Sequence, residues 1–214
     1  SDREPVDIMG VIAFPNPNKD ERVIRFIDSE YHTLFTIKDG ESIVITRFDG
    51  EKMVFPCKYI DDCHVCIGNS AYHICEFAEM QERNGNIYVP AAPKISDEIG
   101  TYEIYQIPAT ADVDYYFRSY EAAKGKLRSA DYQRSYAGMY AKGNSLEDLW
   151  AKHNRDSRPF AHRMRSMSVS DIVVLTQGGR KTAYYADTIG FKKAPEFLAQ
   201  QRAQKKHKER GEAR

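Results

Sequence analysis

Short apolar runs alternate with turn residues in the first third of the chain. Val, Ile, Thr and aromatic side chains dominate these runs, as expected of β-strands. An Asp-Gly pair at 39–40 separates the run at 31–37 from the run at 42–48, and this arrangement predicts a β-hairpin. Further strands are expected at 9–14, 23–28, 53–55, 64–67 and 72–75, with a turn at 15–18.

A helix and a proline-containing linker follow this β-rich region. We predict a short helix over residues 75–83, since Asn84-Gly85 is typical of a helix C-terminus. Residues 89–94 contain two prolines, which lack a backbone donor and favour an extended chain. We therefore place a boundary near residue 95. The expected modules are an antiparallel β-rich domain at 1–94, an α+β domain at 95–200 and a basic, fraying tail at 201–214.

The second module combines strand and helix patterns, and the fold class is therefore α+β. Apolar residues recur at helical spacing over residues 113–123, and Gly125 ends the pattern. Another helix is expected to begin at Asn144 or Ser145, because Glu147 matches a capping box counted from Asn144. Strands are expected at 102–107, 169–175 and 182–187, with a turn at 177–179 and a last helix from Pro195.

Composition and charge narrow the class of protein. At 214 residues and 42% hydrophobic content the chain can bury a core without disulfides. No run approaches the ~20 apolar residues of a membrane span. All four cysteines lie between positions 57 and 75, unlike a secreted disulfide framework, so we expect a soluble protein of the cytoplasm.

The two halves carry opposite charge although the formal net charge is zero. Residues 1–100 contain 10 Lys and Arg against 18 Asp and Glu, whereas residues 101–214 contain 21 against 13. Such polarity either attracts the halves to each other or gives the second half an affinity for polyanions. With a short linker between them, we expect a compact monomer in which acidic residues of the first half meet basic residues of the second.

Three stretches of the second module carry a family resemblance. They are Tyr102–Ile107, Leu146–Trp150, and Met167–Leu175 with Tyr184–Phe191. Together they resemble the YodL-like domain over about residues 100–198. The resemblance implies an accessory protein of an integrative or conjugative element, in a family without an assigned activity, so no catalytic residue transfers from it.

A second resemblance concerns the first module. His64–Gly68, Cys75–Glu79 and Arg83–Gly85 are similar to a large polyvalent protein-associated domain of the kind that often precedes a YodL-like domain. Tyr132, Tyr136 and Tyr140 lie four residues apart, a spacing that fits one face of a helix and equally one face of a strand. The YodL-like resemblance favours a strand there.

A zinc site is one candidate for chemistry. Cys57, Cys63, Cys66 and Cys75 offer thiolates at short spacing, but only Cys63-x-x-Cys66 has the usual zinc-knuckle spacing. In an alternating strand these two side chains point to opposite faces. Cys66 and Cys75 are more readily interpreted as small buried residues, and the protein is expected to need no cofactor.

Two polar groups have plain structural interpretations. His64 and His73 are expected to pair across a turn at 68–70 on a half-exposed sheet face, and Asp61-Asp62 to form a solvated turn. In Ser168-Val169-Ser170-Asp171, the Ser170 and Asp171 side chains are expected to bond local backbone, because no catalytic partner motif accompanies them.

A binding surface is the other candidate. Tyrosines and arginines are concentrated in the second half, where they can either bind nucleic acid or form a protein interface. The candidate binding residues are Tyr132, Tyr136, Arg155, Arg158, Arg163, Arg165, Lys205 and Lys206. The common nucleotide, dinucleotide, zinc-protease and EF-hand motifs are absent. We therefore expect a non-enzymatic protein that binds a host or element-encoded protein, with nucleic-acid binding and a zinc-stabilised module as alternatives.

Overall fold

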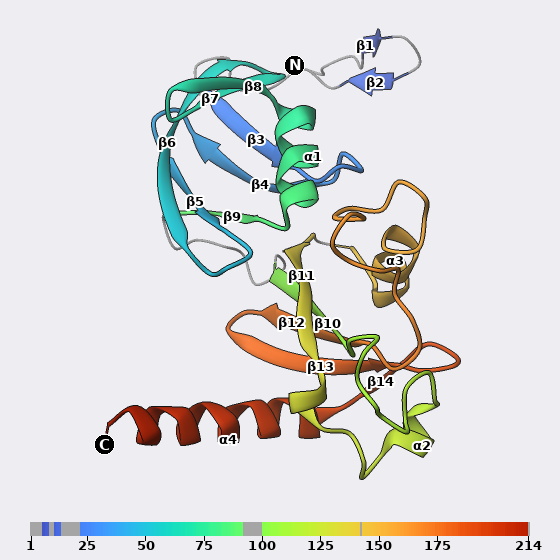
Figure 1. The fold of residues 1–214 in the computed structure, drawn as a ribbon. Helices are drawn as coiled ribbons and strands as arrows, with labels where there is room; N and C mark the ends of the chain where they lie inside the picture. The colour runs from blue at the N-terminus through green and yellow to red at the C-terminus, as the bar shows by residue number, and fades with distance from the viewer. Residues whose placement is uncertain (1–5, 9–10, 14–21, 92–99, 142, 214) are drawn as a thin grey trace.

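The chain folds into two β-sheet-based halves with helices packed against them (Figure 1). The computed structural model describes residues 6–8, 11–13, 22–91, 100–141 and 143–213. Four α-helices accompany antiparallel sheets in these ranges, so the predicted α+β class is confirmed. The predicted turn at 15–18 and the second half of the predicted linker, residues 92–94, lie outside the described residues.

The first half is built from short antiparallel strands around one helix. Strands β5 to β9 form one sheet in the order β8-β7-β6-β5-β9, while β1 pairs with β2 and β3 pairs with β4. The bounds are β1 Val6–Ile8, β2 Val11–Ala13, β3 Val23–Ile27, β4 Thr33–Lys38, β5 Ser42–Thr46, β6 Lys52–Asp61, β7 His64–Ile67, β8 Ser70–His73, α1 Ile74–Asn84 and β9 Ile87–Pro90.

Helix α1 and the β7–β8 hairpin agree with the sequence pattern. Gly85 adopts the left-handed conformation that ends α1, with φ 67°, and its N–H bonds the last turn. His64 lies opposite His73 in the β7–β8 register, with ring centroids 5.1 Å apart, so the predicted cross-strand pair is confirmed.

The predicted hairpin at Asp39-Gly40 is wrong. The chain does turn there, because Glu41 N–H bonds Lys38 O, but β4 pairs with β3 and β5 pairs with β6 and β9. The turn therefore carries the chain from one sheet to the other. Val89 and Pro90, which we assigned to the linker, form the end of edge strand β9.

The second half has one five-stranded antiparallel sheet with a packed face on each side. Its strand order is β11-β10-β12-β13-β14. Along β12, Ile172 and Val174 contact one apolar cluster, while Val173 and Leu175 contact the other. The uninterrupted apolar run of this strand is thus explained by burial on both faces. The bounds are β10 Gly100–Gln106, β11 Gln133–Tyr140, β12 Ile172–Gln177, β13 Arg180–Ala186 and β14 Phe191–Lys193.

Helices of the second half depart from the sequence pattern in two places. Only Tyr120–Ala123 is helical (α2) within the helix expected over 113–123, and the preceding residues form turns. The basic tail continues as helix α4, Pro195–Glu212, although we expected it to fray. Besides these, a 3-10 turn covers Ser129–Asp131 and α3 covers Leu146–Lys152. None of the described helices is long and apolar enough to cross a membrane.

Two further expectations concern α3 and the tyrosine segment. The capping box of α3 exists, but it joins Ser145 to Asp148 and not Asn144 to Glu147. Tyr136 and Tyr140 lie in β11 and Tyr132 directly precedes it, so the strand implied by the family resemblance is confirmed.

Candidate functional site at the junction of the two halves

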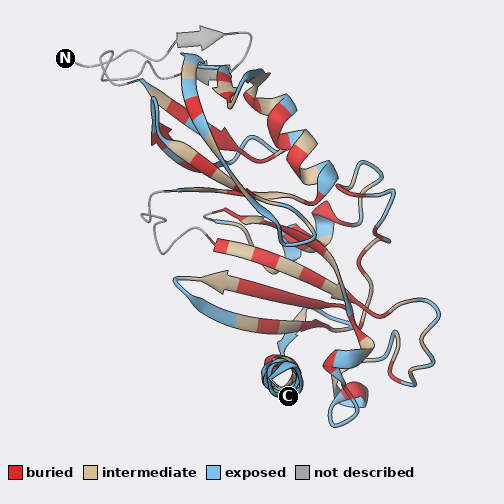
Figure 2. Cartoon of the chain, turned by 60° about the vertical axis from the view of Figure 1, so that its left-hand side comes forward, coloured by how far each residue is buried: buried red, intermediate tan, exposed pale blue. Residues whose placement is uncertain are grey.

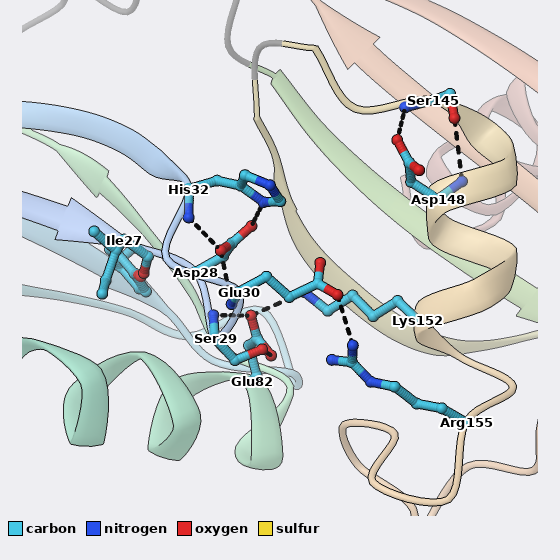
Figure 3. A network of polar contacts seen from close by, with 11 residues as sticks. Ile27, Asp28, Ser29, Glu30, His32, Glu82, Ser145, Asp148, Lys152 and Arg155 are labelled. Atoms are coloured by element: carbon cyan, nitrogen blue, oxygen red, sulfur yellow. Dashed lines mark hydrogen bonds and ion pairs between the residues drawn. The ribbon is translucent and has the colours of Figure 1, made fainter. Parts of the chain in front are cut away.

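The two halves meet where the C-terminal ends of α1 and α3 face each other (Figure 3). Glu82 of α1 accepts a hydrogen bond from Lys152 Nζ of α3 at 2.9 Å. Its carboxylate also accepts from the Ser29 backbone N–H and hydroxyl, at 3.0 and 2.6 Å. The Lys152 and Glu82 side chains are 8% and 15% exposed, so this ion pair is largely removed from water.

A second ion pair lies nearer the surface. Arg155 Nη1 lies 2.6 Å from Glu30 Oε1, and both side chains are about a third exposed. Both pairs join an acidic residue of the first half to a basic residue of the second, so the expected charge-matched contact between the halves is confirmed.

The turn after β3 holds these acidic side chains in place. Asp28 is 5% exposed, and its Oδ1 accepts from the backbone N–H groups of Glu30 and His32 at 2.9 Å. Its Oδ2 lies 2.9 Å from His32 Nδ1. Among the described residues, Asp28, Glu30 and His32 are the one set of three acidic, His or Cys side chains close enough to share a metal ion. Their oxygens are already engaged with N–H groups and Arg155, so we assign them the role of shaping this turn.

A buried histidine supports the same junction from the second half. His153 follows Lys152, is fully buried, and has its Nε2 2.9 Å from the Tyr102 hydroxyl. Its Nδ1 is buried and has no hydrogen-bond partner among the described residues. Burial, together with the positive charges of Lys152 and Arg155, lowers the pKa of His153 to about 3, so the ring is neutral at pH 7.

The loop after α3 closes the junction. Phe160 has a positive φ of 59°, is 3% exposed and packs on Phe48 of the first half, with ring centroids 5.4 Å apart. Between this loop, Ser29 and the end of α1 lies a cavity of about 550 Å³. Arg83, Arg155 and Arg158 are among its lining residues.

The cysteines of the zinc hypothesis do not form a site. Cys57 is buried and Cys63 is exposed, while Cys66 and Cys75 are half-buried. Burial raises the pKa of the Cys57 thiol to about 11, which disfavours the thiolate that zinc requires. The described residues contain no group of three ligand atoms that includes a cysteine.

Four of the eight candidate binding residues are engaged inside the protein. Tyr132 and Tyr136 are 8% and 1% exposed, so their rings are in the core and are not presented to a base or a partner. Arg155 pairs with Glu30, and Arg165 Nη2 lies 3.0 Å from Asp171 Oδ1. Arg163, Lys205 and Lys206 are exposed and Arg158 is half-buried.

Asp171 forms a buried polar network in the second half. Its carboxylate accepts from Arg165, from Gln106 Nε2 at 2.9 Å and from the Ser168 backbone N–H at 2.9 Å. The Ser170 hydroxyl accepts from the Phe117 backbone N–H. The predicted bond to local backbone is confirmed for Asp171, which accepts from Ser168. It is wrong for Ser170, whose partner Phe117 is distant in sequence and is brought close by the tertiary fold. Burial raises the pKa of Asp171 to about 6, against the effect of Arg165.

Sequence reasoning missed Glu82, Lys152 and Ser29, the residues at the centre of the junction. The charge difference between the halves predicted that opposite charges would meet, without indicating which ones. One local signal existed: Lys152 directly precedes His153, which the helical pattern of α3 places on its apolar face.

Comparison with known proteins identifies part of the second half. Residues 101–197 match the YodL-like domain, which covers β10 through the beginning of α4. The resemblance seen in the sequence is thereby supported for this half. No curated protein and no solved structure matches the chain.

Proposed function

We propose that this chain is a non-enzymatic accessory protein of a mobile genetic element and that, as a monomer, it binds a host or element-encoded protein. The binding surface is the outer face of the first-half sheet, which we call the valine face and define as Val44, Val54, Ile87 and Val89. Counter-defence against a host system is one role that such binding would serve. The similarity of the first half to large polyvalent protein-associated domains is part of the same proposal.

The supporting observation is a row of apolar side chains where polar ones are expected. Val44 lies opposite Val54 of β6 and opposite Val89 of β9, so the three side chains share one face. The neighbouring Ile43 and Ile45 point inward and are buried, whereas Val54 is 63% exposed. A sheet with one packed face ordinarily has polar residues on the other. An exposed apolar patch on a monomer is typical of a protein-interaction surface.

The chemistry of the surroundings suggests the kind of partner. Lys52 and Lys58 are exposed on β6, on the same side as Val54. An apolar centre with a charged rim is the usual anatomy of a protein interface. The partner is therefore expected to present apolar side chains bordered by acidic groups.

A charge placed on the valine face is expected to abolish partner binding. Val54→Asp buries a carboxylate in the interface without a counter-charge, so affinity should fall by a factor of about 100 or more. Thr36→Asp is the matched control, because Thr36 is an exposed outward position of β4. Affinity capture from the native host with quantitative mass spectrometry, followed by binding of the purified partner, measures the effect. Recovery of no specific partner, or equal loss in both variants, would contradict the proposal.

Nucleic-acid binding by helix α4 is a second candidate. The helix is anchored by Phe197 and Leu198 in its first turn, and every residue from Arg202 to Ala213 is exposed. Figure 2 shows α4 end-on, with its C-terminal end in the colour of exposed residues. Residues 201–213 contain five Lys and Arg against two Glu. A basic helix that projects into solvent suits the phosphate backbone, whose contribution to affinity is strongly salt-dependent.

Removing three lysines of α4 should weaken binding to nucleic acid. We expect Lys205→Gln, Lys206→Gln and Lys208→Gln together to reduce the salt dependence, d log K/d log[salt], by about one unit for each phosphate that the helix then fails to neutralise. The control replaces Lys38, Lys52 and Lys58, which are exposed in the first half. Gel shifts with single-stranded DNA, duplex DNA and RNA over a salt series measure this change in affinity. If the unmodified protein shows no shift at low salt, this candidate function is excluded.

A further inference from the structure

The cavity between the halves has the size of a small-molecule site. Its volume is about 550 Å³, within the range of roughly 300 to 1,000 Å³ found for ligand pockets. One wall is the end of α1 with Arg83, and the opposite wall is the loop after α3 with Arg155 and Arg158. A ligand there would contact both halves of the chain.

The lining offers more donors than the protein uses. Within the described part of the chain, no ion pair or side-chain hydrogen bond involves Arg83 or Arg158, and Arg155 is paired through its Nη1 to Glu30. A guanidinium group has five N–H donors. The arginines that line the cavity therefore have N–H groups free to bond an acceptor inside it.

The carboxylates of the lining do not supply that acceptor. Glu82 already accepts from Ser29 and Lys152, and Glu79 is exposed on the surface of α1. Glu30 engages only Nη1 of Arg155. Three guanidinium groups thus border the cavity, while the Glu82 carboxylate in its lining is paired with Lys152.

We propose that this cavity binds a small molecule through a phosphoryl group. A guanidinium presents parallel N–H donors that match phosphate oxygens. A phosphate with three terminal oxygens can accept from three arginines at once, whereas a carboxylate has two oxygens. Pro159, Phe160 and Ala161 also line the cavity and provide an apolar wall for the organic part of the ligand. The site is independent of the valine face and of helix α4.

Pyrophosphate is the probe for this site. With the full chain, millimolar pyrophosphate should raise the temperature of thermal unfolding and give a saturable signal in titration calorimetry, because the anion binds only the folded state. Acetate and chloride at the same ionic strength should not. An equal shift with acetate would show general ionic screening and overturn the proposal.

Variants locate the binding. Arg158→Met and Arg83→Met, from opposite walls, should each weaken pyrophosphate binding by about tenfold or more, since each removes a charge-assisted hydrogen bond. Arg83 is exposed on α1, so its replacement leaves the packing intact if Arg158→Met should fail to fold. Arg180→Met, at the exposed start of β13, is the control and should bind as the unmodified protein does. Unchanged affinity in Arg83→Met would overturn the assignment of the cavity.

Discussion

Glu82→Gln is expected to lower the free energy of unfolding by about 3–5 kcal/mol, the largest effect of any single charge neutralisation in this junction. The substitution keeps the shape of the side chain but leaves Lys152, whose side chain is 8% exposed, without a counter-charge for its ammonium. An uncompensated buried charge costs far more than the ion pair contributes, because the lone ion has lost its hydration. Urea unfolding monitored by fluorescence measures the change.

Glu30→Gln is the matched control. It removes the same charge from the outer ion pair with Arg155, whose side chains are 35% and 37% exposed. A pair so accessible to water contributes about 0–1 kcal/mol. Equal losses in the two variants would show that burial of the inner pair has no energetic consequence. The double variant Glu82→Gln with Lys152→Met should recover part of the loss, because it removes both charges.

Acidification below pH 6.5 is expected to destabilise the protein through His153. The folded state keeps this ring neutral down to about pH 3, whereas the unfolded chain takes up a proton near pH 6.5. The stabilisation is therefore fully present above pH 6.5 and is lost as pH falls toward 3. Its contribution changes by about 1.4 kcal/mol per pH unit across that window.

Asp171 changes the free energy of unfolding with pH in the opposite direction to His153. Variants are therefore needed to separate the two contributions. Its carboxyl has a folded-state pKa of about 6, above its ordinary value, so its contribution is present at low pH and is lost as pH rises through 6. Unfolding free energies at several pH values, taken as differences between His153→Gln and the unmodified protein, isolate the histidine. His207→Gln, exposed on α4, should keep the full pH dependence. If His153→Gln keeps it too, the assignment to His153 fails.

The elements that the sequence pattern predicted well are those whose ends are set by the conformational preferences of nearby residues. The C-terminus of α1 depends on Gly85, and the β12–β13 hairpin depends on the glycines between two apolar strands. Helix α4 extends through the tail that we expected to fray, because its residues are good helix formers and Phe197 anchors its first turn, which lowers the cost of nucleation.

The sequence pattern predicted the wrong local structure where apolar side chains pack into the core from turns instead of from a helix. Val113, Tyr116 and Tyr120 have helical spacing, yet the first two lie in turns and still pack against the same apolar cluster. The helical spacing did not identify the buried side chains either, because Tyr115 is buried and Phe117 is 54% exposed. The hairpin prediction at Asp39-Gly40 was wrong for a similar reason. A turn reverses the chain but does not determine which strands pair.

The sequence by itself determined the α+β class, most strand positions and the opposite charges of the two halves, because these follow from local propensity and composition. Only the tertiary structure decided that Glu82 meets Lys152, that Tyr136 is buried, and that Arg83 and Arg158 border one cavity. These contacts join residues far apart along the chain. Their formation depends on how two packed halves fit together, which no local pattern of residues encodes.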